Sequence, residues 1–488
     1  MFALLRVFRA PALAALASVL AACTVGPAFQ RPSAPAPASY LAPDEKAAAL
    51  SGTESPATPY AQQLLLGQDP AAMWWTLFES ASLDRLIRQA LGENRTLAAA
   101  RASLAEAREL VAAANGARYP QVNLNAGVGR QQYGEELFGP SFSLPAFSYM
   151  ALGGSVSYTV DYLGGVARSV EERRALAQYQ ESETQAASLA LTGSVITQAL
   201  LAASTQAQIQ AVTQLLDQDR DNLRLVQTAF DNGSVSRVDV LTAQSQLASD
   251  TTLMPPLRQQ LATARHALAV LTGSAPANSR LPELTLAELK LPRELPLTLP
   301  SELAHRRPDI LAAEAQLHAA TAAVGIATAD LYPRITLTAS GGYQANPGAP
   351  LFSSGNTAWT LISGLTQPIF DGGTLRARRR AALDELRASA ARYQEVVLES
   401  FQQVADVLDA LSHDAELLTA QSNALAAARS SVELARESYA AGNSGVLEVL
   451  DAQRLLLQAQ LGVVRAQAQQ YLDTTQLLLA LGGAAPTS

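Results

Sequence analysis

Apolar and polar residues alternate along four short segments of the chain, over lengths close to that of a tilted strand crossing a bilayer. The segments are residues 121–129, 150–162, 334–343 and 356–370. Their apolar residues fall on one strand face and Gln, Asn, Ser or Thr on the other, less regularly in the fourth. Two hairpins on a soluble helical domain would alternate in the same way, but no further β-rich segment could cover their apolar faces. The pattern therefore predicts membrane strands.

A second pattern, with Leu, Val and Ala at every third or fourth position, predicts helices of unusual length. Segments 166–232 and 374–443 contain few helix breakers. At ~1.5 Å per residue, each helix would be about 100 Å long. Each reverses at a glycine turn and returns as a second helix. A plain coiled-coil rod would give the same pattern, but it would not explain why each rod is fused to a membrane-type hairpin.

Both patterns occur twice, at an offset of roughly 210 residues. DYLGGVARSVEERR parallels IFDGGTLRARRRAA, FDNGSVSRVDVLTAQSQL parallels YAAGNSGVLEVLDAQRLL, and LTGSAP parallels LGGAAP. Several matches in the same order indicate a true duplication. We therefore assign a first structural repeat to residues 71–273, a Pro-rich joint to 274–300 and a second repeat to 301–488.

The N-terminus carries a short basic segment and then a small-residue apolar run that ends in LAAC. This arrangement is typical of a secretory signal peptide, here residues 1–22. The LAAC sequence resembles a bacterial lipobox, which implies cleavage before Cys23 and acylation of that residue, an anchor strong enough to hold a protein at a membrane. An ordinary signal peptide next to a stray cysteine is the alternative. Residues 23–70, rich in Pro, Ala and Ser, predict an extended lipidated tether.

No later segment has eighteen consecutive apolar residues, so we expect the mature chain to cross a membrane with strands and not with helices. Four strands cannot close a barrel, and an open sheet edge is not tolerated in lipid. Several copies must therefore combine their strands. Two copies would give the smallest barrel, and three copies of four strands would give a twelve-strand barrel with room for a lumen.

Composition excludes several classes of function. The net charge is −8, and no basic stripe with interleaved aromatic residues is present, so we predict no nucleic-acid partner. The single cysteine excludes an intrachain disulfide and a paired-cysteine metal site. The four histidines are scattered, and no Ser-His-Asp arrangement, phosphate loop or metal-ligand spacing stands out. We therefore predict no enzyme activity, no metal and no cofactor beyond a covalent lipid on Cys23.

Five segments carry a resemblance to a known family. They are CTVGPAFQRP; WWTLF with LDRLIRQALGENRTL; RRPDILAAEAQLHAATAAVGIATADLYP; FDGG; and YAAGNSGVLEVLDAQRLLLQAQ. Together they resemble the TolC-like outer-membrane factors, in particular the lipoprotein branch of multidrug-efflux outer-membrane channels. The resemblance implies a mainly α fold with a membrane β-barrel portion. Long antiparallel helices would form a trimeric periplasmic α-barrel, and each subunit would add four strands to a shared twelve-strand barrel.

The same resemblance implies a function. The homotrimer would lie in the bacterial outer membrane, in contact with its lipid, and would passively conduct small molecules such as drugs and toxic compounds. It would dock on a periplasmic adaptor and a proton-driven inner-membrane pump, which supplies the energy. Two alternatives stay open: an outer-membrane channel for type I protein secretion, and a structural envelope lipoprotein that does not conduct.

The segment LEVLDAQ, just after the second glycine turn, supplies a candidate periplasmic gate. Leu447, Glu448 and Asp451 share one helix face because they are three or four residues apart. The resemblance implies that this face narrows the tunnel, so that three copies form acidic rings that favour cations. Asp239 is the first-repeat counterpart of Glu448, whereas Thr242 stands where the second repeat has its aspartate. A solvated helix face near a turn is the alternative.

For adaptor docking we favour the two glycine turns, residues 230–238 and 439–446. Exposed turns with small residues can accept a hairpin of a partner. The residues concerned are Gly233, Ser234, Gly442, Ser444 and Gly445. Some members of the family carry Arg near the position of Ser444, so a salt-bridge lock is not expected at this tip. Alternatively, the tips only reverse the helices and docking uses the helix sides.

Overall fold

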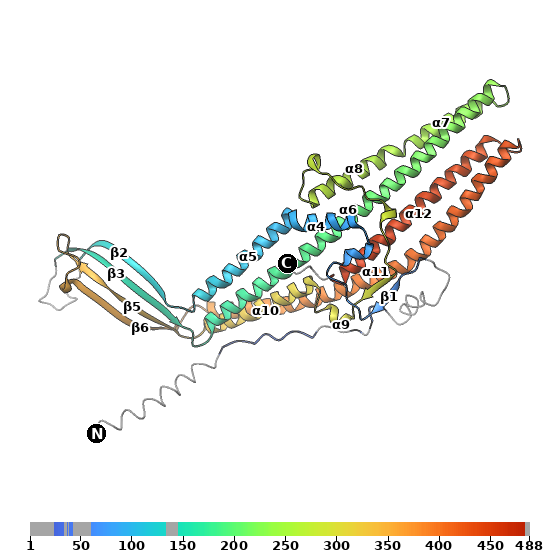
Figure 1. The fold of residues 1–488 in the computed structure, drawn as a ribbon. Helices are drawn as coiled ribbons and strands as arrows, with labels where there is room; N and C mark the ends of the chain where they lie inside the picture. The colour runs from blue at the N-terminus through green and yellow to red at the C-terminus, as the bar shows by residue number, and fades with distance from the viewer. Residues whose placement is uncertain (1–23, 34–36, 38, 42–59, 133–144, 484–488) are drawn as a thin grey trace. The chain divides into compact units, whose positions relative to one another are not determined.

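The computed structural model describes residues 24–33, 37, 39–41, 60–132 and 145–483 (Figure 1). The predicted signal peptide and Cys23 lie outside the described residues. The chain divides into two compact units, each built from three segments. The first unit comprises the described parts of Met1–Pro32, Ser103–Gln180 and Ala313–Tyr393, and the second those of Ser33–Ala102, Glu181–Ala312 and Gln394–Ser488.

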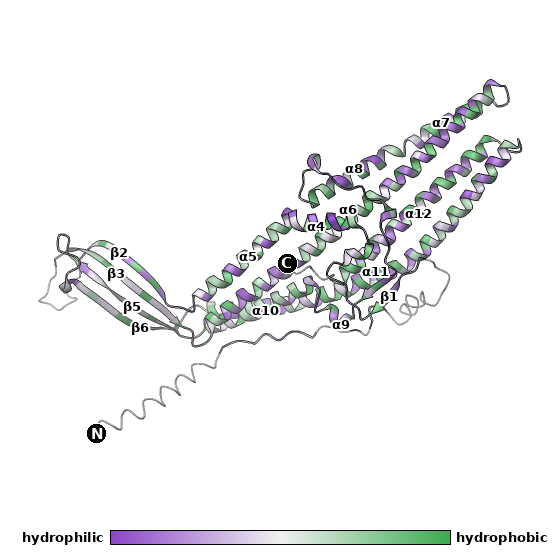
Figure 2. Cartoon of the chain, in the orientation of Figure 1, coloured by the Kyte–Doolittle hydropathy of each residue, from purple (hydrophilic) through white to green (hydrophobic). Residues whose placement is uncertain are grey.

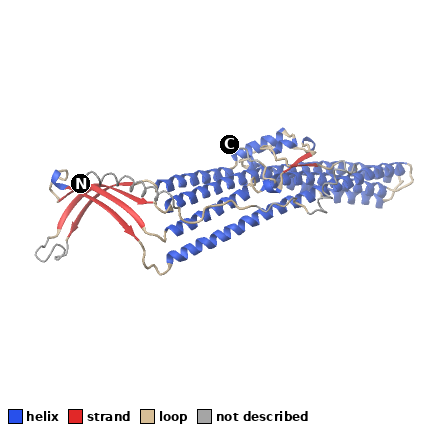
Figure 3. Cartoon of the chain, turned by 90° about the horizontal axis from the view of Figure 1, so that it is seen from below, coloured by secondary structure: helices blue, strands red, loops and turns tan. Residues whose placement is uncertain are grey.

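The first unit contains an antiparallel sheet of four strands in the order β2-β3-β5-β6, drawn as curved strands in Figure 3. The strands are β2 (Gln121–Gln131), β3 (Phe147–Val160), β5 (Arg334–Ala345) and β6 (Thr357–Thr366). Each overlaps one of the four predicted segments, but β2 and β5 end two residues later than predicted and β3 starts three residues earlier. The last strand ends at Thr366 and not at residue 370, because Pro368 has no N–H to donate to the sheet.

The strand register gives the sheet one apolar and one polar face. One row of cross-strand partners contains Val122, Val156, Ala339 and Leu361. The next row contains Asn123, Ser155, Ser340 and Thr360. Because side chains alternate between faces, a slip of one residue would move the whole apolar set to the other face. The register therefore confirms the alternation predicted from the sequence.

Two helices of 67 residues each run through both units: α6 (Gly165–Asp231) and α11 (Thr374–Ala440). Their bounds are close to the predicted segments. The second repeat returns as one helix, α12 (Val446–Ala480). The first repeat returns as two, α7 (Arg237–Thr251) and α8 (Met254–Leu271). Two consecutive prolines in the first turn of α8 explain the break, since proline is tolerated there but not in a helix interior.

Shorter elements complete the described chain. The helices are α4 (Ala81–Glu93), α5 (Arg95–Gly116), α9 (Pro300–Leu303) and α10 (Pro308–Ala329). The short 3-10 helices are η1 (Trp74–Phe78), η2 (Pro276–Asn278), η3 (Leu286–Glu288) and η4 (Ser354–Asn356). A small parallel pair joins β1 (Gln63–Leu66) to β4 (Glu294–Leu297). This pair links the tether to the Pro-rich joint, and the sequence pattern did not predict it.

The largest apolar core lies in the second unit. Trp74 and Phe78 of η1 are each 1% exposed and pack in a cluster with Ile196 and Leu200 of α6. The indole N–H of Trp75 donates a hydrogen bond to a carboxylate oxygen of α4, at 3.0 Å. The WWTLF motif is therefore a structural anchor of this unit.

Among the described residues, two helices are long and apolar enough to cross a membrane by length and composition: α6 and α10. Half of the apolar window of each is buried inside the protein, as in the core helices of soluble proteins. The sequence criterion, an uninterrupted apolar run, did not select them because polar residues such as Thr192 and Gln198 interrupt α6. Length and composition alone are weak evidence for a span.

Candidate functional site

The two helix reversals, which we call the tips, have the same backbone conformation. Gly233 and Gly442 follow α6 and α11 with φ of +73° and +75°. At the first tip, the N–H of Ser234 donates to the carbonyl of Ala229 at 2.9 Å, and the equivalent bond closes the second. This is the Schellman arrangement, in which a left-handed residue ends a helix. Glycine occupies that position without steric cost, so helix termination by itself explains why both tips contain glycine there.

The tips differ in how the return helix begins. Ser236 caps α7 and forms a capping box with Asp239, whose carboxylate accepts from the backbone N–H of Ser236 at 2.8 Å. The hydroxyl and amide of Ser236 hold the pKa of Asp239 below its usual value. At the other tip Gly445 occupies the cap position and offers no side chain. The carboxylate of Asp239 is thus engaged at its own helix start, whereas that of Glu448 is not used in a cap.

The gate candidates of the second repeat lie together on the first turns of α12. Leu447 is 53% exposed, and Glu448 and Asp451 are also exposed. The residues between them, Val449 and Leu450, are buried in the core of the unit. The predicted shared face therefore points away from the core of this subunit. Whether it faces a lumen stays a prediction.

Asp451 has an ion-pair partner that the sequence analysis missed. Its Oδ1 lies 3.4 Å from Nη2 of Arg454, one helix turn away. Both side chains are exposed, so the pair contributes little to stability, but the guanidinium offsets part of the negative charge. The i,i+3 spacing of an acid and an arginine was the signal that could have revealed the pair.

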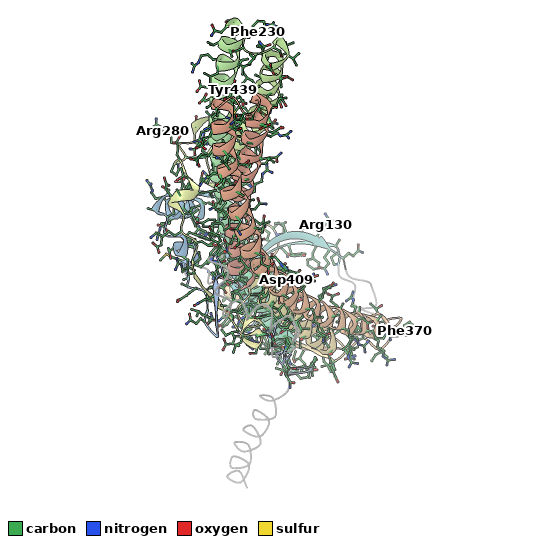
Figure 4. The ribbon with its side chains drawn as sticks, turned by 90° about the vertical axis from the view of Figure 1, so that its right-hand side faces the viewer. Arg130, Phe230, Arg280, Phe370, Asp409 and Tyr439 are labelled. Carbon is green, nitrogen blue, oxygen red and sulfur yellow. The ribbon has the colours of Figure 1, made fainter. Side chains whose placement is uncertain are left out.

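Apolar side chains hold the two tips to each other. Val226, Val240, Val446 and Leu450 form a buried cluster. Phe230 and Tyr439, both labelled near the tips in Figure 4, pack against it. By contrast, a Cβ added at Gly233, Gly442 or Gly445 would meet no atom within 4 Å. The tips are therefore internally packed but present open backbone at their ends.

Among the described residues, two carboxyl pairs, each containing a buried aspartate, join the long helices to their return helices, and the sequence did not reveal them. Asp219 of α6 is 2% exposed and lies within hydrogen-bond reach of Asp250 of α7; burial and this neighbour raise the pKa of Asp219 to about 7. Asp414 of α11 forms a similar pair with Asp473 of α12, and its pKa is also raised to about 7, by burial first. Each pair can share one proton between the two helices of a hairpin.

The apolar face of the sheet is open. Val122, Leu124 and Leu361 are between 74% and 79% exposed, and Figure 2 shows hydrophobic residues recurring along the strands. Such a large exposed apolar surface marks a protein or membrane contact.

The first described residues of the chain pack at the end of this sheet. The N–H of Val25 donates to the carbonyl of Leu163 at 3.0 Å, just after β3. Further along, the ring of Phe29 stacks on His318 of α10, at 4.3 Å between centroids. Arg31 pairs with Glu314 at 2.7 Å. Residues 24–31 of the predicted tether are therefore docked on the first unit, whereas its later described residues belong to the second unit, where the hydroxyl of Tyr40 donates to the carbonyl of Thr298 at 2.8 Å. The described residues contain no group of three His, Cys, Asp or Glu side chains that could hold a metal ion.

The sequence profile of the outer membrane efflux protein family matches residues 86–274 and 299–483. The chain belongs to this family. The pyoverdine export outer membrane protein OpmQ of Pseudomonas putida is 31% identical over 437 residues, which cover 89% of this chain and 91% of OpmQ. The probable outer membrane lipoprotein SilC of Salmonella typhimurium is 28% identical over 466 residues, 95% of this chain and 96% of SilC.

A solved structure of the outer-membrane channel OprN agrees in fold, with a TM-score of 0.84 and 28% identity over 94% of this chain and 99% of that one. The predicted resemblance to TolC-like outer-membrane factors is confirmed. So is the efflux function at the level of the family, whose members are outer-membrane efflux proteins. The roles of the individual gate and tip residues stay predictions.

Proposed function

We propose that this efflux protein is a homotrimeric exit channel, through which small molecules leave an inner-membrane pump and a periplasmic adaptor for the exterior. One observation carries the proposal: a sheet of four strands with a continuous exposed apolar face and two strands, β2 and β6, that each have only one neighbour. Lipid can cover the face, but nothing in lipid can satisfy the free N–H and C=O groups of the edges.

The strand directions support closure between copies. Each neighbouring pair in the order β2-β3-β5-β6 is antiparallel, so β2 and β6 run in opposite directions. The β6 edge of one copy can therefore continue as an antiparallel pair with the β2 edge of the next. Three copies of four strands give an even-numbered barrel wide enough for a lumen.

The remaining parts of the proposal use the tips and the N-terminus. The open backbone at Gly233, Gly442 and Gly445 would receive the adaptor, and Leu447, Glu448 and Asp451 would narrow the periplasmic entrance. A proton-driven inner-membrane pump would supply the energy. Acylation at Cys23 would anchor the protein, which agrees with the docking of Val25 at the end of the sheet. The printed name of SilC, an outer membrane lipoprotein, supports this anchor by similarity.

Single-channel recording on the purified protein tests the proposal. We expect discrete conductance steps in planar bilayers and a trimeric mass in detergent. A silent bilayer would favour the structural lipoprotein, and a folded monomer with its sheet in water would contradict the shared barrel.

A second measurement is needed to decide whether the channel transports small molecules or proteins. OpmQ is named for pyoverdine export, and this relationship favours small-molecule efflux over type I protein secretion. Deleting the gene should sensitise the cell to small toxic compounds without changing its secreted proteins. The opposite result would assign the channel to protein secretion.

A further inference from the structure

A basic segment starts α11, directly after the last strand of the sheet. Arg376, Arg378, Arg379 and Arg380 are all exposed. No acidic residue occurs between Asp371 and Asp384. The acids that flank this stretch are engaged: Asp371 accepts from the amides of the helix start, and Asp384 pairs with Arg387 at 2.9 Å. The four guanidinium groups, which we call the basic collar, thus form no salt bridge among the described residues, although the amides of the helix start, and then the charge of Arg376, lower the pKa of Asp371.

Local helix stability does not explain the basic collar. The N-terminal end of a helix carries partial positive charge, so cations in its first turns are unfavourable and carboxylates are preferred. Four arginines in the first two turns of α11 run against this preference. Such a placement points to an external anion.

The first repeat shows what the equivalent position looks like when it is covered. At the start of α6, Arg168 is 6% exposed, pairs with Glu171 at 2.7 Å and donates to the carbonyl of Val25 in the N-terminal segment at 3.3 Å. At the start of α11, none of the described residues covers the chain in a comparable way. Ile369 and Phe370 are each 92% exposed, and Figure 4 labels Phe370 at the sheet-side end of α11.

The apolar residues next to the collar continue the exposed face of the sheet. Trp359, Leu361 and Leu365 of β6 are between 69% and 80% exposed. If this face lies in hydrocarbon, the chain leaves the membrane after Thr366, and the arginines follow at the level of the headgroups. One guanidinium group can donate two parallel hydrogen bonds to the oxygens of a phosphate. Exposed apolar side chains enter the boundary between headgroups and acyl chains.

We propose that Arg376, Arg378, Arg379 and Arg380, with Ile369 and Phe370, form a docking surface for anionic phospholipid headgroups of the periplasmic leaflet. The inference rests on the proposed membrane position of the sheet. A second copy of the chain is the other occupant, because the closure proposed above places the β2 edge of the next copy beside β6; the test below distinguishes it from lipid. Within the same copy, Asp161 accepts from two amides of α6, and Asp330 lies 3.7 Å from Arg334.

The test uses the full-length trimer in detergent, titrated with phosphatidylglycerol or with phosphatidylcholine as the neutral probe. Bound lipid is counted by native mass spectrometry. Each arginine near an anionic surface strengthens binding by about fivefold, so the wild type should prefer phosphatidylglycerol by at least about tenfold. The preference should weaken as salt is raised. Replacing all four arginines by Gln should abolish it.

Two variants control this experiment. Arg429→Gln with Arg436→Gln removes exposed charge from the same helix far along the chain and should keep the preference. Replacing the four collar arginines by Lys keeps the charge and should keep most of it. An unchanged preference in the four-Gln variant would overturn the proposal. Dissociation of that variant into monomers, while the Lys variant stays trimeric, would assign the collar to the neighbouring copy. Failure of the wild type to conduct is a separate result and would count against the channel itself.

Discussion

At the residue scale, aspartates in similar helical sequence serve different purposes. Asp239 completes the capping box at the start of its own helix. Asp451 is exposed and pairs weakly with Arg454. Asp219 is buried against another carboxyl group. The surroundings decide these differences, since the side chain is the same in each case.

Asp451→Ala should raise single-channel conductance, by about twofold or more, because it removes a ring of carboxylates from the proposed constriction. The measurement is conductance in planar bilayers at fixed salt. Asp409→Ala, which removes an exposed acid from the middle of α11, should leave conductance near the wild-type value. Equal conductance in the Asp451 variant and the wild type would remove Asp451 from the gate.

Asp219 makes stability depend on pH. Its folded pKa of about 7 lies above the ordinary value of an unfolded aspartate, so the folded state holds the proton more tightly. Its stabilising contribution is full below about pH 4, is lost as the pH rises to about 7, and stays lost above. Asp219→Asn keeps a neutral side chain, so it should raise the unfolding temperature at pH 8 by a few degrees and flatten the curve between pH 5 and 8.

Thermal unfolding of the trimer across that pH range checks this expectation. Asp221→Asn is the matched control, because Asp221 is exposed and pairs with Arg224 at the surface. It should keep the wild-type slope. A steep, unchanged slope in the Asp219 variant would mean that its carboxyl group does not carry the proton.

At the element scale, the two repeats resemble each other more in backbone conformation than in the side chains at equivalent positions. Gly233, Gly273, Gly442 and Gly482 all end helices with positive φ, between +73° and +79°. The caps that follow have diverged, as the serine of one tip and the glycine of the other show. Backbone geometry tolerates few residues at a left-handed position, whereas a cap can be exchanged at modest cost.

Exchanging the caps should move the local stability of the two tips in opposite directions. Ser236→Ala removes the capping box and should cost about 1 kcal/mol locally, while Gly445→Ser supplies a missing cap and should gain a few tenths. Hydrogen exchange of the tip amides is the measurement. Exchange should speed up at the first tip in one variant and slow down at the second in the other. Identical exchange in both would show that side-chain caps do not limit tip opening.

Two adjacent glycines of β5 offer a matched test of the sheet. Gly342 lies opposite Gly153 of β3, and a Cβ on Gly342 would overlap the carbonyl of Leu152. A Cβ on Gly341 would meet nothing within 4 Å. Gly342→Ala should therefore destabilise the sheet by about 1–3 kcal/mol, whereas Gly341→Ala should be neutral. The two variants are compared by their yield of heat-resistant trimer on a semi-denaturing gel. Equal yields would contradict the close approach of the β3 and β5 backbones at Gly342.

At the scale of the whole molecule, the unpaired edges of the sheet set the assembly. In a helix the backbone groups bond to one another within the same segment. By contrast, β2 and β6 each leave the N–H and C=O groups of one edge without a strand partner among the described residues. Edge strands of this kind pair with another chain unless they are blocked. We therefore expect the subunits to assemble by continuing the sheet from the β6 edge of one copy to the β2 edge of the next.

Cross-linking the two edges should count the copies. Asn125→Cys in β2 and Thr360→Cys in β6 lie on the same polar face. With a flexible bis-maleimide, the double variant should give covalent trimers on a denaturing gel. Each single variant should give dimers at most. A series of bands that stops at the dimer in the double variant, or continues beyond the trimer, would contradict a closed ring of three.

The sequence by itself determined the strands, the two long helices, their glycine reversals and the duplication. These features arise from periodicity and backbone preference, which are local properties that a single chain displays in order. The family came from the resemblance of motifs such as YAAGNSGVLEVLDAQRLL to known members and not from periodicity.

Only the tertiary structure decided which side chains meet. The β1–β4 pair joins residues more than 200 positions apart in sequence, the carboxyl pair of Asp219 and Asp250 depends on how two helices pack, and the docking of Val25 depends on a distant strand end. Contacts of this kind follow from the packing of complete elements, and composition and spacing do not encode them in any one window. The same reason explains why Arg168 is covered while the collar arginines of the equivalent helix start are bare.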